Sequence, residues 1–155
     1  MARETMRRQA ADNEYLHKDF HGALSAGIEY LHRHYGAQAV KDYLRDFTLS
    51  YYAPLRQALK DRGLPAIEAH FRELYRIEGA DAVIECTPDV LLVHVPACPA
   101  VRHLREQGYP VAALFVETTR TVNQALCEET PFTAELCAYD EETGRSVQCF
   151  YRKPS

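Results

Sequence analysis

Apolar side chains in the first 79 residues recur at the spacing of amphipathic helices. From about residue 12 to residue 35 they fall three or four positions apart, which places them on one helix face. These positions are Phe20, Leu24, Ile28, Leu31 and Tyr35. A second stripe runs from Val40 to Leu55, and Pro54 predicts a break or kink there because proline removes a helical hydrogen bond. A third helix is predicted between Pro65 and Gly79.

The pattern changes at about Ala80, where short β-prone runs replace the helical spacing. Residues 82–86 and 90–95 flank the turn-forming segment 87–89, Thr-Pro-Asp, and therefore predict a hairpin. Two later runs, residues 133–139 and 146–152, flank a polar loop ending in glycine and predict a second hairpin.

Two helices are predicted between the hairpins. Pro99 and Gly108 bracket the first, and the second extends from about Ala112 to Cys127. The sequence therefore predicts an α+β fold, in which a helical half, residues 1–79, packs on a ββααββ antiparallel sheet unit, residues 80–155. At 155 residues the chain fits a single domain.

Composition limits the cellular compartment and the classes of partner that we expect. The chain is 46% hydrophobic and 26% charged, which is ordinary for a globular protein. A net charge of −4 with interspersed signs favours neither nucleic acid nor a membrane as partner. The apolar runs are too short to span a bilayer and the first residues lack a secretory signal, so we expect a soluble cytoplasmic protein. The expected partner is a small-molecule ligand, and a homodimer stays open.

Five cysteines are present, an odd number with no CxxC pair. They are Cys86, Cys98, Cys127, Cys137 and Cys149. With no secretory signal we expect reduced thiols, and because the cysteines lack ligand spacing we expect no structural metal site and no cofactor. Cys137 and Cys149 fall on the two arms of the last predicted hairpin, and one register would place them opposite each other. The two thiols could then form a disulfide, which a reducing compartment disfavours.

Cys98 is the first candidate for chemistry. Pro99 at the start of a helix would make Cys98 the N-cap, where free N–H groups and the helix dipole favour a thiolate. We expect the pKa of its thiol to fall by about one from the ordinary value of about 8.5. Arg102 and His103 would add positive charge and could bind an anionic substrate group. The alternative is a packed thiol without chemistry.

Histidines supply the candidate acid–base groups. His17 and His21 are four residues apart, and Glu14 precedes His17 by three, so all three would share a helix face. That spacing suits acid–base work or a metal, and the alternative is one packed histidine beside one surface histidine. His94 lies in the run of residues 90–95, four positions before Cys98, and could open on the same cavity.

Thr118 begins a polar stretch, residues 118–121, inside an otherwise apolar predicted helix. Threonine is not a strong helix former, so this stretch could face a polar pocket. Solvent exposure is the alternative.

A cysteine–proline pair after a hairpin, Cys98-Pro99, is followed by a helix ending at Gly108, a second helix and a last strand carrying Cys149-x-Tyr151. With these features, the sequence from about residue 80 onward resembles the L-2-amino-thiazoline-4-carboxylic acid hydrolase-like family. Family members often carry a further cysteine shortly after the position of Gly108, and residues 109–115 contain none. The resemblance implies a hydrolase that opens a small cyclic amidine-like ring next to a carboxylate.

Two functions from different classes follow. The first is a small-molecule hydrolase with a candidate catalytic set of Cys98, His94 and His21 and a candidate substrate-binding set of Arg102, His103 and Thr118. The second is a non-catalytic ligand-binding or sensor domain that holds an apolar or aromatic ligand among the tyrosines of the helical half. A closed apolar cavity away from Cys98 and the histidines would favour binding. A structural or dimerising domain without a pocket is the third alternative.

Overall fold

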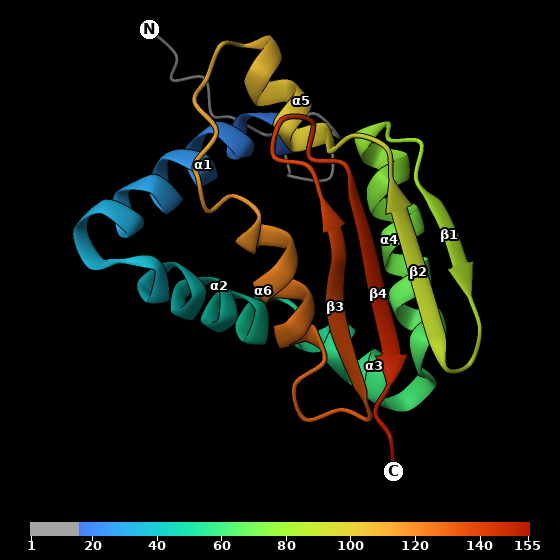
Figure 1. Ribbon diagram of the computed structural model, residues 1–155. Helices are drawn as coiled ribbons and strands as arrows, with labels where there is room; N and C mark the ends of the chain where they lie inside the picture. Colours follow the sequence, from blue (N-terminus) through green and yellow to red (C-terminus); the bar gives the residue numbers. More distant parts are fainter. Residues whose placement is uncertain (1–15) are drawn as a thin grey trace, which may run out of the picture.

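The computed structural model describes residues 16–155, and side chains from residue 20 onward. Helices come first and a four-stranded antiparallel sheet follows, with two helices between its hairpins (Figure 1), so the predicted α+β fold is confirmed. None of the described helices is long and apolar enough to cross a membrane. Glu14 and the side chain of His17 lie outside the described part of the chain.

Four helices form the N-terminal half. They are α1 (Leu16–Tyr35), α2 (Ala37–Tyr51), α3 (Ala53–Arg62) and α4 (Leu64–Glu78). Pro54 lies in the first turn of α3, so it separates two helices rather than bending one. Pro65 occupies the same place in α4, and Gly79 ends α4 in the left-handed conformation, at φ 68°.

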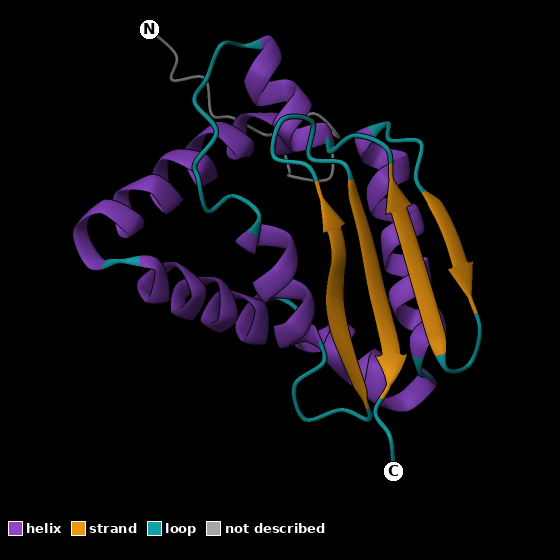
Figure 2. Cartoon of the chain, viewed as in Figure 1, coloured by secondary structure: helices purple, strands orange, loops and turns teal. Residues whose placement is uncertain are grey.

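The sheet combines the two predicted hairpins. Its strands are β1 (Val83–Cys86), β2 (Val90–Val95), β3 (Phe132–Tyr139) and β4 (Ser146–Arg152). Their order is β1-β2-β4-β3, so the last strand lies in the interior, between β2 and β3 (Figure 2). The connecting helices are α5 (Pro99–Glu106) and α6 (Glu117–Leu126).

Within residues 16–155, helices pack on one face of the sheet and leave the other face uncovered. Leu91, Val93 and Phe150 point to the packed face and are fully buried against α3 and α4, which lie behind the sheet in Figure 1. A second core joins α1 and α2 to α5, around Ile28 and Leu104. Strand residues that alternate with the buried ones are only half-buried or exposed, as expected for an antiparallel sheet covered on one side.

Residues 112–116 form turns, so the prediction that the second connecting helix begins at Ala112 is wrong. The buried hydroxyl of Ser25 accepts a hydrogen bond from the N–H of Ala112 at 2.9 Å and donates one to the carbonyl of Pro110 at 3.1 Å. This pairing fixes the segment against α1, and α6 begins only at Glu117.

The apolar stripes predicted in the helical half are only partly buried. Phe20 is 65% exposed, Tyr35 68% and Tyr51 64%, although each continues the helical spacing of core residues. The middle of each stripe, represented by Ile28 in α1 and Leu44 in α2, does form the core. The three exposed rings therefore lie outside this core.

A β-bulge changes the register of the last hairpin. Leu136 pairs with Gln148 and Ala138 with Val147, so Cys137 is an extra residue without a partner in β4. Glu135, not Cys137, lies opposite Cys149. The register that would place the two cysteines opposite each other is therefore not the one adopted.

The loop between β3 and β4 packs closely against the start of α5. Gly144 has a φ of 69°, and a Cβ added there would overlap the Cβ of Cys98 and come within 2.9 Å of Val101 Cγ2. The backbone N–H of Cys98 donates to the carbonyl of Thr143 at 3.0 Å. A glycine is therefore required at this position both for its backbone conformation and for space.

Gly144→Ala should destabilise the protein more than Gly108→Ala. Both glycines have a φ near 70°, but a Cβ at Gly108 meets nothing within 4 Å. Both variants carry the cost of left-handed backbone, and overpacking should add about 1–3 kcal/mol at Gly144 alone. Urea unfolding of the two variants measures this difference. Equal losses of unfolding free energy would show that the loop moves aside without cost.

Candidate functional site

Two histidines, a glutamate, a tyrosine and a cysteine from three separate helices gather at one end of the fold. We call this set the polar cluster: His21, Tyr75, Glu78, Cys98 and His103. His21 Nε2 lies 3.4 Å from Glu78 Oε2, and the two side chains are only 15% and 12% exposed. The rings of His21 and His103 are 6.4 Å apart. The negative charge of Glu78 raises the pKa of both Cys98 and Tyr75, in addition to the larger effect of burial on each.

The cluster forms where the beginning of α1, the end of α4 and the beginning of α5 meet (Figure 1). Gly79 ends α4 directly after Glu78, so this carboxylate sits in the last helical turn. The ring of Tyr109, just after α5, lies about 3.8 Å from the Cβ position of Gly22 and brings α1 against this segment. These contacts place His21 beside both neighbouring helices.

Cys98 occupies the predicted N-cap position of α5. Its backbone is extended, at φ −70° and ψ 123°, and its carbonyl accepts the N–H of Arg102 at 2.9 Å. Its side chain makes no capping hydrogen bond. The position was therefore predicted correctly, and although no full capping hydrogen bond forms, the N–H groups of Val101 and Ala100 lie close enough to affect the thiol.

The thiol of Cys98 is not activated in this arrangement. Burial raises its pKa, and this effect exceeds the lowering by the N–H groups of Val101 and Ala100. Glu78 raises the pKa further, and the charge of Arg102, an exposed side chain, opposes it only weakly. The predicted lowering of this pKa is wrong, because the sulfur is packed beneath the loop at Gly144 rather than facing solvent at the helix end.

His94 is not brought together with Cys98. In the sheet it pairs with Val83 and Val147, and its side chain lies on the uncovered face with Leu92. Cys98 lies on the helix-covered side, where its charge contributes to raising the pKa of Tyr75. The two residues therefore do not share a cavity, because the strand directs His94 away from the helices.

The predicted substrate-binding residues separate as well. His103 belongs to the polar cluster, whereas Arg102 is exposed on α5. The hydroxyl of Thr118 donates to the carbonyl of Phe115 at 2.7 Å, at the start of α6. Thr118 thus satisfies its own helix end and does not join the cluster.

Sequence reasoning missed Glu78, and it considered Tyr75 only as one of the tyrosines of the helical half. The only local signal was the position of Glu78 directly before the helix-ending Gly79. Its partner His21 is 57 residues away in the sequence, and no periodicity relates the two. Within residues 16–155, no group of three or more His, Cys, Asp or Glu side chains is placed to hold a metal ion.

An apolar groove with a volume of about 300 Å³ lies between α1 and α2. None of its lining residues belongs to the polar cluster. They are Ala23, Leu24, Gly27, Ile28, Tyr30, Leu31 and Tyr43. Small side chains at Ala23 and Gly27 leave the hollow, and the rings of Tyr30 and Tyr43, both half-exposed or more, form part of its wall.

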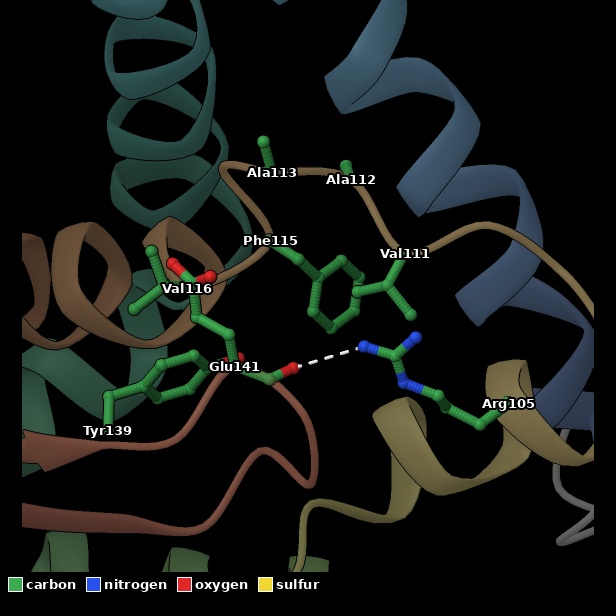
Figure 3. Close-up of a pocket in the computed structure, with 8 residues that line it drawn as sticks. All are labelled: Arg105, Val111, Ala112, Ala113, Phe115, Val116, Tyr139 and Glu141. Carbon is green, nitrogen blue, oxygen red and sulfur yellow. Dashed lines mark hydrogen bonds between the residues drawn. The ribbon is translucent and has the colours of Figure 1, made fainter.

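A smaller pocket of about 80 Å³ lies between α5, the turns of residues 111–116 and the end of β3 (Figure 3). Arg105 reaches across it and donates to the carbonyls of Glu141 and Glu142, at 3.3 and 3.1 Å. Burial raises the pKa of Tyr139, on the other side, to about 12. This pocket is smaller than the sites of drug-sized ligands, which occupy roughly 300–1,000 Å³.

Comparison with known proteins finds no matching family model, no matching curated protein and no matching solved structure.

Cys98 should react slowly with iodoacetamide, and the pH dependence of its alkylation should have a midpoint above its ordinary pKa. The reason is burial, which disfavours the thiolate. Peptide mass spectrometry across a pH series would follow Cys98 beside the exposed Cys137 as an internal comparison. The midpoint reports ionisation and is independent of how slowly the reagent enters. A midpoint below about pH 8 would restore the activated nucleophile.

Proposed function

We propose that the protein is a small-ligand-binding domain that holds an apolar or aromatic molecule in the groove between α1 and α2. The observation that carries this proposal is the groove itself, about 300 Å³ in volume and lined by aliphatic and tyrosine side chains. Small-molecule sites are concave and mostly apolar, with few polar groups, and this groove has that character.

The position of the groove supports binding over catalysis. Among the described residues, its lining contains no histidine, cysteine or carboxylate, and therefore no acid, base or nucleophile of these kinds. The hydroxyl groups of Tyr30 and Tyr43 supply polar ends to otherwise apolar walls. Such a site would recognise a ligand by shape and apolar surface, with one or two hydrogen bonds for orientation.

The size of the groove indicates which range of dissociation constants a binding experiment should cover. A ligand that buries about 200 Å² of apolar surface gains roughly 5 kcal/mol before the cost of association, so its dissociation constant should be about a few hundred micromolar or weaker. Titrations should therefore extend from micromolar to millimolar ligand.

Gly27→Leu should weaken binding of the aromatic probe 8-anilinonaphthalene-1-sulfonate about tenfold or more, because the new side chain fills the groove. A Cβ at Gly27 meets nothing within 4 Å, and leucine favours a helix over glycine, so the fold should be retained. Fluorescence titration measures the affinity.

Ala26→Leu is the matched control. Ala26 is the exposed neighbour of Gly27 on α1 and does not line the groove. This variant should bind the probe as the unmodified protein does. Equal binding by all three proteins would mean that the probe sits elsewhere, and the groove would lose its role.

Hydrolysis at the polar cluster is the second candidate. The specific observation in its favour is the buried His21–Glu78 pair beside Cys98. A carboxylate hydrogen-bonded to a histidine orients the ring as a general base, and such a base could activate water against an amidine carbon. In this candidate, His103, whose ring lies 6.4 Å from that of His21, would hold the substrate carboxylate. The resemblance of residues 80–151 to the amino-thiazoline carboxylate hydrolases implies the same reaction class.

Glu78→Gln separates this candidate from the first. If the cluster is catalytic, the protein should hydrolyse 2-amino-thiazoline-4-carboxylate, and the variant should lose about 100-fold in rate because the base is no longer oriented. Glu73→Gln, an exposed position on the same helix, should keep the rate. Product formation is followed by chromatography. No turnover by the unmodified protein, or equal rates in all three proteins, would reject the assignment for this substrate.

A further inference from the structure

The bulge in β3 places two thiols together on the uncovered face of the sheet. Glu135, opposite Cys149, lies on this face, and so do Cys137 and Ala138 because the extra residue shifts the alternation by one. Tyr139 consequently pairs with the buried Ser146 and turns toward the helices. Cys137 and Cys149 are thus diagonal neighbours on adjacent strands.

Both thiols are reachable from solvent. Cys137 is exposed and Cys149 is half-buried. They are also close enough for each to affect the other, since both the charge of Cys137 and a hydrogen bond with it contribute to raising the pKa of Cys149, after the larger effect of burial. Cys137 has no partner in the ladder, so its backbone can adjust without breaking a strand pair.

We propose that Cys137 and Cys149 form a reversible thiol modification site, at which low-molecular-weight disulfides of the glutathione type oxidise the pair to an intramolecular disulfide. The bulge and the open sheet face together create this site, and neither the ligand groove nor the polar cluster is needed for it.

The reaction has two exchange steps. The Cys137 thiolate attacks one sulfur of the small disulfide, whose S–S bond breaks and releases one small thiolate. Cys149 then loses its proton to solvent, and its sulfur attacks the Cys137 sulfur of the mixed disulfide and displaces the second small thiolate. The two protons lost by the protein convert the leaving thiolates to thiols. Two protein thiols are thereby oxidised and one small disulfide is reduced to two thiols.

The other three cysteines are not placed to form such a pair. Cys127 is buried, and burial raises its pKa to about 12. Cys98 is packed beneath Gly144. Cys86 lies on the edge strand β1, opposite Leu91, and points to the helix-covered face. None of these thiols has a second cysteine beside it in the adjacent strand, so a mixed disulfide on any of them would have no resolving partner.

The full-length reduced protein, treated with glutathione disulfide and examined by intact and peptide mass spectrometry, tests the proposal. The expected product lacks two hydrogen atoms, carries no glutathione and contains a Cys137–Cys149 cross-linked peptide. Cys149→Ser should instead accumulate a stable glutathione adduct on Cys137, because no resolving thiol remains. Cys86→Ser, the matched control, should form the cross-link as the unmodified protein does.

Three results would overturn the proposal. One is a stable glutathione adduct on Cys137 in the unmodified protein without conversion to the cross-link. The second is a cross-link that joins any other pair of cysteines. The third is loss of the cross-link in the Cys86→Ser variant, which would show that the open-face pair does not react on its own. Both Cys137→Ser and Cys149→Ser change accessible side chains, and circular dichroism would verify that each variant is folded.

Discussion

The two halves of this fold are joined by the buried side-chain amide of Gln148, in the interior strand β4. It is 2% exposed, and all of its hydrogen-bonding groups are used. Its Oε1 accepts from Asn123 of α6 at 2.7 Å, and its Nε2 donates to the hydroxyls of Tyr75 of α4 and Ser146, both at 3.2 Å. A buried polar group without a partner costs about 1–3 kcal/mol, so replacing Gln148 alone would leave Asn123 and Tyr75 each with that cost. The network therefore holds α4 and α6 at one relative position on the sheet.

That position determines where the polar cluster forms. Tyr75, fixed by Gln148, is one helical turn before Glu78, so holding the tyrosine also holds the carboxylate at the end of α4. The loop at Gly144 then presses Cys98 into the same region. This packing half-buries Cys98, and burial is the largest cause of its raised pKa. The same contacts that assemble the cluster thus raise the pKa of the Cys98 thiol, which weakens the case for Cys98 as a nucleophile. The hydrolysis proposal therefore depends on the His21–Glu78 pair.

Local sequence signals predicted the elements well because each depends on near neighbours. Pro99 and Gly108 marked α5, and the Thr-Pro-Asp segment marked the first hairpin. The predictions failed where a contact between residues far apart in the sequence determines the structure. Ser25 fixes residues 112–116 as turns from 87 positions away. The bulge at Cys137 depends on how β3 pairs with β4. Of the polar cluster, sequence reasoning named Cys98, His21 and His103 but not Glu78. It also grouped His94 with Cys98, although the alternation of side chains along β2 directs His94 to the opposite side of the sheet. Burial, which reversed the expected pKa of Cys98, is likewise a property of the assembled fold.

The groove between α1 and α2 also depends both on local sequence and on contacts between distant parts of the chain. The core that binds these helices together uses their middle residues, such as Ile28 and Leu44, and packs them on α5. On the side of α1 beyond this core, Ala23 and Gly27 replace the larger residues that would fill the space against Tyr43. Water in contact with the apolar walls of this hollow costs free energy. The fold does not require the hollow, because a Cβ at Gly27 would meet no other atom within 4 Å. A purely structural helix pair would gain helix stability from alanine or leucine there. The proposal of ligand binding gives this glycine a reason, the space that it leaves, which the proposal of catalysis does not.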